Sequence, residues 1–331
     1  MLFFNTLIMG TMLAISSYSW FSMWMGLEIN LLSIIPLISK NNNIYPAESA
    51  MKYFLTQSMA SVILLFAIIL SLNLFDTIKT DLNHPVTMVL NSALFMKMGA
   101  APFHFWFPEI MEGLNWMNCL IMLTWQKIAP MVILMYNIKL SLFISIIIIS
   151  SNFIGSIMSL NQISLRKILA YSSINHIGWM LSSMLVSQYI WSLYFLIYSI
   201  ISMNIIFIFN SFNIFMLKQT FYTLNKNKTL KILLSFNFIS LGGLPPFLGF
   251  FPKWMTINFL VEKKFIFLSL IMIILTLITL FVYLRVIFHS LTINMNEILT
   301  SYKLKINLLP LIFNFCSLSL LTLSPLILNL T

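Results

Sequence analysis

Residues 97–109 read KMGAAPFHFWFPE, and residues 241–254 read LGGLPPFLGFFPKW. The first stretch lies within an apolar run over residues 86–113, and the second lies within a run over residues 232–260. Proline removes a hydrogen bond from a helix and clashes with the preceding turn, so both runs are predicted to unwind near their middle. Interrupted helices in corresponding halves of a chain are typical of membrane transport sites, although ordinary proline kinks are the alternative.

The composition excludes a single water-soluble domain. The 331 residues are 60% hydrophobic and 8% charged, whereas soluble domains contain roughly 45–50% apolar and about 25% charged residues. A bilayer solvates apolar side chains, so a membrane protein does not need a polar surface to cover them. The runs are long and continuously apolar, unlike the short alternating strands of a membrane β-barrel. The chain is therefore predicted to be an all-α polytopic membrane protein.

The apolar runs define about eleven predicted membrane-spanning helices. They lie near residues 2–18, 20–39, 53–75, 86–113, 116–138, 140–160, 168–187, 189–217, 232–260, 265–288 and 306–330. The interrupted runs are the fourth and the ninth, so the first five and the next five helices are predicted to be two repeats inserted in opposite orientations. This layout predicts a first repeat over residues 1–138, a second over 139–290, and a C-terminal loop and helix over 291–331.

The net charge of +10 arises mostly from basic residues at the edges of apolar runs, which indicates topology rather than a nucleic-acid surface. Loops on the N-terminal side carry Lys40, Lys52, Arg166, Lys167, Lys218, Lys226, Lys228, Lys231, Lys303 and Lys305. Loops on the opposite side carry only Lys79, Lys139, Lys263 and Lys264. The positive-inside rule then places the N-terminus on the cytoplasmic or matrix side and the C-terminus on the other. The first run has neither a secretory-signal nor a transit-peptide pattern, so it is predicted to remain as a helix.

Three ionisable residues lie near the middle of apolar runs. Lys127 has eleven residues of its run on either side, and Lys97 and Glu28 lie similarly deep. Each costs about 2.5–3.5 kcal/mol at a helix centre unless it is paired or hydrated. A structural ion pair such as Glu28 with Lys97 is one explanation. The excess of buried amines over buried carboxylates favours a hydrated charge pathway instead.

Lys253 is the fourth candidate, although it lies seven residues from the end of its run and could reach the membrane surface. It follows the Pro245–Pro246 interruption, so we expect it to occupy the place that Lys97 has at the other interruption. His104 and His176 are possible relay residues, because imidazole both donates and accepts protons. The alternative for each histidine is a packed, hydrogen-bonded side chain.

No redox or metal chemistry is predicted for this chain. It has no dinucleotide-binding glycine motif, no phosphate-binding loop and no CxxC pair. Cys119 and Cys316 both lie in apolar runs and are predicted to be small core residues.

The stretches at 97–109 and 240–254, with LAYSSINHIGWM at 169–180, resemble the antiporter-like membrane subunits of respiratory complex I. These are similar to subunits of multisubunit sodium/proton antiporters. The composition, rich in Met, Ile, Asn and Phe, is similar to that of mitochondrially encoded members from animals, insects in particular. The resemblance covers nearly the whole chain. It implies a multi-pass subunit of proton-translocating NADH:ubiquinone reductase in the mitochondrial inner membrane.

The resemblance also implies site residues, cofactors and partners. The family's buried charged axis, which is thought to couple redox energy to proton movement, matches Glu28, Lys97, Lys127 and Lys253. His104 and His176 match less decisive positions. The chain would hold no cofactor, while the whole complex uses NADH, FMN, iron–sulfur clusters and ubiquinone. Its partners would be other membrane-arm and accessory subunits and membrane phospholipids, which would also fill the space of three N-terminal helices found in bacterial members.

Two other functions remain open from the sequence. A stand-alone monovalent cation/proton antiporter would use the same lysines without a partner or NADH. A structural membrane spacer would use the charges only to hold helices together. Migration of the chain with NADH dehydrogenase activity in a very large assembly would favour a complex I subunit over the antiporter. Normal pumping after substitution of all four charged residues would indicate the spacer.

Overall fold

The computed structural model describes residues 1–39, 44–77, 83–138, 141–224 and 228–291. Within these ranges the regular secondary structure is α-helical and no strand is present, which confirms the predicted all-α character. The predicted span over residues 306–330, with Cys316, lies outside the described residues.

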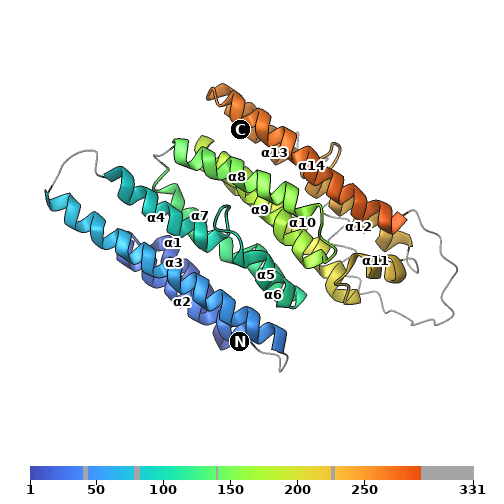
Figure 1. The fold of residues 1–331 in the computed structure, drawn as a ribbon, viewed down its shortest axis with the longest axis horizontal. Helices are drawn as coiled ribbons and strands as arrows, with labels where there is room; N and C mark the ends of the chain where they lie inside the picture. Colours follow the sequence, from blue (N-terminus) through green and yellow to red (C-terminus); the bar gives the residue numbers. More distant parts are fainter. Residues whose placement is uncertain (40–43, 78–82, 139–140, 225–227, 292–331) are drawn as a thin grey trace. The chain divides into compact units, whose positions relative to one another are not determined.

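The helices labelled in Figure 1 belong to two compact units. The unit Met1–Ile154 contains α1 (Leu2–Ser16), α2 (Trp20–Ile38), α3 (Ile44–Thr77), α4 (Asn83–Met98), α5 (Trp106–Gly113), α6 (Trp116–Leu123) and α7 (Trp125–Met135). The unit Gly155–Thr331 contains α9 (Leu165–Val186), α10 (Gln188–Phe212), α11 (Leu217–Leu224), α12 (Lys228–Gly242), α13 (Phe250–Glu262) and α14 (Ile266–Leu291). The division falls within α8 (Ser141–Ser159), and the predicted repeats, which meet at residues 138 and 139, stay a prediction.

Long apolar helices account for the membrane character of the chain. Among the described residues, six segments are long and apolar enough to cross a membrane: Trp20–Ile38, Ile44–Leu72, Trp116–Met135, Ser141–Ser159, Gln188–Phe212 and Ile266–Phe288. Both predicted interruptions are present. The fourth run is divided between α4 and α5, and the ninth is divided between α12 and α13.

The fifth run differs from its prediction. An uninterrupted helix was expected over residues 116–138, but α6 ends before Thr124 and α7 begins after it. The Thr124 hydroxyl donates to the carbonyl of Leu120 at 2.7 Å, a local bond that competes with helix continuation. Pro130 has no N–H with which to bond the carbonyl of Gln126. The hydroxyl bond lies at the break itself, and the missing proline bond lies in the first turns of α7.

Small residues bring α1 and α2 into close contact. A Cβ atom added to Gly26 would lie 2.6 Å from the backbone nitrogen of Ala14, and one added to Gly10 would lie 3.0 Å from that of Asn30. Small residues of this kind let the backbones of membrane helices approach closely, which increases van der Waals contact. The N-terminal hairpin therefore depends on the absence of side chains at two positions.

Helix α9 is polar for a membrane helix and is buried around its whole circumference. Its buried side chains include Ser172, Ser173, Asn175 and His176, and it packs against α10, α13 and α14. Other helices, rather than lipid, therefore surround its polar residues. This explains why a segment of 22 residues does not meet the apolarity of a lipid-facing span.

Candidate functional site

Lys97 lies in the last turn of α4, just before the first interruption. Its side chain is buried, at 7% exposure. Its carbonyl accepts a hydrogen bond of 3.4 Å from Gln57 Nε2 of α3. Glu28 of α2 is close enough to act electrostatically on its ammonium. The ion pairs between described residues do not include Glu28 with Lys97, so this pair stays a prediction.

Glu28 is less deeply buried than the lysines, but its Oε2 atom is shielded from solvent and has no hydrogen-bond partner among the described residues. Buried carboxylate oxygens need a donor, and water supplies one where protein does not. The environment of Glu28 therefore suits a hydrated site better than a closed ion pair.

Lys127 lies in the first turns of α7, immediately after the break at Thr124, and is 1% exposed. Its Nζ atom stands 5.6 Å from the centre of the Phe107 ring, a cation–π distance. Phe107 belongs to α5 and packs against Gly99, whose added Cβ would lie 3.3 Å from it. Phe107 therefore lies between the amine of Lys127 and the turn at Gly99.

Lys253 lies in the first turn of α13 and is 7% exposed. Its Nζ atom donates to the carbonyls of Leu241 and Gly242, at 3.2 and 2.8 Å, and lies 5.8 Å from the centre of the Trp179 ring. The last carbonyls of a helix lack intrahelical partners and carry the negative end of its dipole. Lys253 therefore caps α12 across the interruption that separates α12 from α13.

The expected equivalence of Lys97 and Lys253 is wrong. Gly99 follows α4 and Gly243 follows α12, each with a positive φ, of 75° and 76°. At the same offset along the chain, Trp106 matches Phe250 as the first residue of the next helix, and Glu109 matches Lys253. Lys97 precedes its interruption, whereas Lys253 follows the other. The expectation failed because it used nearness to proline rather than the register of the two loops.

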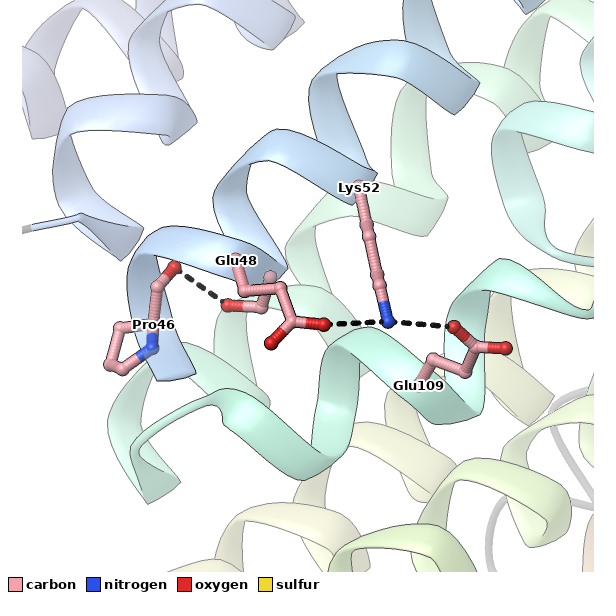
Figure 2. A network of polar contacts seen from close by, with 5 residues as sticks. Pro46, Glu48, Lys52 and Glu109 are labelled. Carbon is pink, nitrogen blue, oxygen red and sulfur yellow. Dashed lines mark hydrogen bonds and ion pairs between the residues drawn. The ribbon is translucent and has the colours of Figure 1, made fainter. Parts of the chain in front are cut away.

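Glu109 takes part in a different interaction (Figure 2). Lys52 of α3 lies between Glu48 of the same helix and Glu109 of α5, at 3.0 Å from each carboxylate. All three side chains are substantially exposed, so these ion pairs contribute little to stability. Closer packing joins the same helices, because a Cβ added to Gly113 would lie 2.8 Å from the carbonyl oxygen of Tyr45.

His176 lies on α9 and hydrogen-bonds to the hydroxyl of Tyr194 on α10 at 2.9 Å. The two residues line a small cavity of about 10 Å³, together with Tyr198, Ser240 and Leu241 among others. This is about the volume that the centre of one ordered water requires. Leu241 also accepts the hydrogen bond from Lys253, so the cavity and the lysine meet at the same turn of α12.

His104 lies in the loop between α4 and α5 and is 2% exposed. Its Nδ1 atom lies 3.2 Å from the carbonyl of Pro102, and its ring contacts Phe105 at 4.4 Å between centroids. Both contacts are local. They favour the packed histidine that the sequence left open as an alternative.

Uncharged polar residues at the site were missed from the sequence. Asn30 and Gln126 hydrogen-bond to each other. Gln57 donates to the backbone carbonyl of Lys97, and the hydroxyl of Tyr194 hydrogen-bonds to His176. An amide inside an apolar run is the signal that could have found them. In the described part of the chain, no group of three or more His, Cys, Asp or Glu side chains could hold a metal ion.

Comparisons with known proteins agree on one family. Residues 17–279 match the family "NADH:quinone oxidoreductase/Mrp antiporter, TM". The NADH-ubiquinone oxidoreductase chain 2 of Anopheles gambiae is 48% identical over 321 residues, covering 96% of this chain and 94% of the relative. That of Locusta migratoria is 47% identical over 306 residues, covering 92% and 89%. These relatives confirm the predicted insect resemblance.

Solved structures share the fold. A chain of respiratory complex I from Thermus thermophilus has a TM-score of 0.86 and 22% identity, over 98% of this chain and 78% of that one. A chain of the Mrp complex from Dietzia sp. has a TM-score of 0.81 and 16% identity, over 98% and 75%. The sequence matches, the shared fold and the two interrupted helices lead to the same assignment. This chain belongs to the NADH:quinone oxidoreductase/Mrp antiporter family of transmembrane proteins.

Proposed function

We propose that this chain is a core membrane subunit of respiratory complex I, in which it contributes to proton translocation coupled to electron transfer from NADH to ubiquinone. The insect relatives at 47–49% identity carry that enzyme's name. The chain would act without a redox centre of its own, in the mitochondrial inner membrane, beside other membrane-arm and accessory subunits and phospholipids.

The observation that carries the proposal is the burial of Lys97, Lys127 and Lys253 inside apolar helical segments. An amine at such a depth costs about 2.5–3.5 kcal/mol. A lysine can release and regain a proton when a neighbouring charge moves, whereas arginine stays charged. We therefore assign these lysines, with Glu28, to a proton relay.

In this mechanism Glu28 and Lys97 approach and separate as charge shifts nearby. The resulting change in the electrostatic field displaces the proton on Lys127. The proton on Lys253, the last site of the proposed relay, is displaced in turn. In its protonated form Lys253 holds the carbonyls that end α12, so transfer of its proton is linked to the conformation of that loop. A water in the cavity beside His176 would join the histidine to this turn.

Substitution of Lys127 tests the relay. Lys127→Met keeps the stem but removes the amine, and Lys127→Arg keeps the charge but removes the ability to lose a proton. We expect both variants of the assembled complex to lower proton-coupled NADH oxidation at least about tenfold. Lys218→Met, at an exposed lysine, is the matched control and should change nothing. Full turnover and proton yield in both Lys127 variants would refute the relay.

The arginine variant also separates the relay from the structural spacer. If Lys127 serves only as a fixed charge between helices, Lys127→Arg should retain normal pumping while Lys127→Met lowers the amount of assembled complex. A proton carrier predicts the opposite result, in which Lys127→Arg assembles but does not pump.

We also propose the finer architecture: about eleven spans, two inverted five-helix repeats with the fourth and ninth helices interrupted, and one C-terminal helix. The matching positions of Gly99 and Gly243 support the repeat. The N-terminus would face the matrix and the C-terminus the intermembrane space. Single cysteines introduced near each end, labelled in intact mitoplasts with a membrane-impermeant maleimide, would report both sides. Labelling of both ends from one side would refute this topology.

A stand-alone monovalent cation/proton antiporter is the second candidate, because the Mrp complex shares the fold. Native electrophoresis of mildly solubilised membranes decides between them. Comigration of this polypeptide with NADH dehydrogenase activity in a very large assembly supports the complex I assignment. Migration alone, with cation-dependent proton flux after reconstitution, would support the antiporter.

A further inference from the structure

Two amide side chains form a reciprocal pair in the unit Met1–Ile154. Asn30 Nδ2 donates to Gln126 Oε1 at 3.1 Å, and Gln126 Nε2 donates to Asn30 Oδ1 at 3.0 Å. The hydroxyl of Tyr53 donates a third bond, of 3.4 Å, to Gln126 Oε1. Asn30 is 3% exposed and Gln126 is half-buried. The pair joins helices α2, α3 and α7 at one point.

The pair lies at a turn of α7 that lacks one backbone hydrogen bond. Gln126 directly precedes Lys127 and lies two residues after the break at Thr124. The amide of Lys127 reaches back only three residues, to the carbonyl of Thr124 at 3.2 Å, and Pro130 provides no N–H for the carbonyl of Gln126. The amide pair adds side-chain hydrogen bonds at this turn, where Pro130 removes a backbone bond.

The same face of α3 reaches the end of α4. Gln57, one turn after Tyr53, donates to the carbonyl of Lys97. The Tyr53 ring meets Trp106 edge-on at 6.0 Å between centroids, and the indole of Trp106 donates to the carbonyl of Met96 at 3.1 Å. One set of uncharged contacts therefore connects the first turn of α7 to the last turn of α4.

We propose that Asn30 and Gln126 are positioning residues, which fix the first turn of α7 and thereby the place of Lys127 beside the α4/α5 interruption. The inference rests on the proposed function, because Lys127 is the group that is positioned. Side-chain amides have no titratable proton near neutral pH, so the pair supports the relay without carrying the proton. A small displacement of a reacting group lowers a rate strongly, which gives the pair a measurable effect.

The test uses the assembled complex, purified with each variant and reconstituted into liposomes. Asn30→Leu and Gln126→Met remove the amides at nearly constant volume, and the exchange Asn30→Gln with Gln126→Asn restores a reciprocal pair of the same total length. Asn118→Leu is the matched control. Asn118 donates to the carbonyl of Leu37 at 3.1 Å and also joins α2 to the broken fifth run, but it lies in α6, before the break at Thr124.

We expect Asn30→Leu and Gln126→Met each to lower coupled NADH oxidation about tenfold and to shift its pH profile. The double variant should be no worse than either single variant, because both remove one unit. The exchanged pair should recover turnover to within about twofold of the native complex. Asn118→Leu should leave both the proton yield and the pH profile unchanged.

Native turnover and pH profile in Asn30→Leu and Gln126→Met, beside an impaired Lys127→Met complex, would overturn the positioning role and leave the relay intact. Native behaviour of Lys127→Met as well would overturn the proposed function itself. If the single variants do not assemble, the exchanged pair and Tyr53→Phe test the positioning role instead. An assembled exchanged pair without recovered turnover, together with native turnover in Tyr53→Phe, overturns the inference.

Discussion

The substitution Gly243→Ala should destabilise the loop between α12 and α13. Gly243 has φ +76°, a conformation that costs an L-residue about 1–2 kcal/mol. The added Cβ would also lie 2.7 Å from Cδ and 3.0 Å from Nζ of Lys253, so the lysine has to move. Loss of one of its hydrogen bonds to Leu241 and Gly242 costs about 1.5–3 kcal/mol more. The local structure is therefore destabilised by roughly 2.5–5 kcal/mol.

Hydrogen exchange measures this effect directly. The amides of Gly243 and Leu244 bond to the carbonyl of Ile239 at 3.1 and 3.4 Å and become exposed when the loop opens. Because 1.4 kcal/mol is a factor of ten, peptides covering this loop should exchange roughly 60 to 4,000 times faster in the Gly243→Ala complex. Proton-coupled turnover should fall with it, since Lys253 leaves its place.

Gly242→Ala provides the control one residue earlier. Gly242 is the last residue of α12, and its added Cβ would meet nothing closer than Tyr283 Cδ2, at 3.6 Å. Alanine favours the helix over glycine by up to about 1 kcal/mol. Exchange should stay the same or slow down. If Gly243→Ala exchanges within about threefold of the native complex, or if Gly242→Ala is equally damaging, the link between loop conformation and Lys253 is refuted.

Three further substitutions test separate parts of the structure. Gly26→Ala should reduce the amount of assembled complex on native gels, because its Cβ would lie 2.6 Å from the backbone of Ala14; undiminished assembly would contradict the close α1–α2 contact. Tyr194→Phe removes the hydroxyl bonded to His176 and should slow coupled turnover about two- to tenfold without loss of assembly; unchanged turnover would leave His176 a packing residue. Glu109→Gln breaks an exposed ion pair, so assembly and activity should be unaffected at physiological ionic strength, and a large loss on native gels would show that the pair matters more than its exposure suggests.

Sequence patterns predicted those parts of the fold that depend on residue type alone. Glycine and proline located both interruptions, and depth within an apolar run identified Lys97 and Lys127 as buried. The register of Gly99 and Gly243 was also available in the sequence. Aligned on these glycines, the two stretches would have matched Lys253 with Glu109 rather than with Lys97.

Features that depend on which helices meet could not be predicted in this way. The pairing of Asn30 with Gln126 joins positions 96 residues apart. The capping of α12 by Lys253 requires the exact path of the loop between α12 and α13. Such contacts are tertiary, so hydropathy and local propensity carry little information about them.

The enclosed position of α9 has a consequence for how the chain is made. A nascent segment enters the bilayer individually when its own transfer from water to lipid is favourable. With Arg166, Lys167 and a series of serines, α9 gains little from lipid, and its residence in the membrane depends on α10, α13 and α14. Two of these three helices are synthesised well after it. Insertion of α9 is therefore a cooperative, late event in biogenesis, and damage to α14 would leave a segment that ends eighty residues earlier without a stable place in the bilayer.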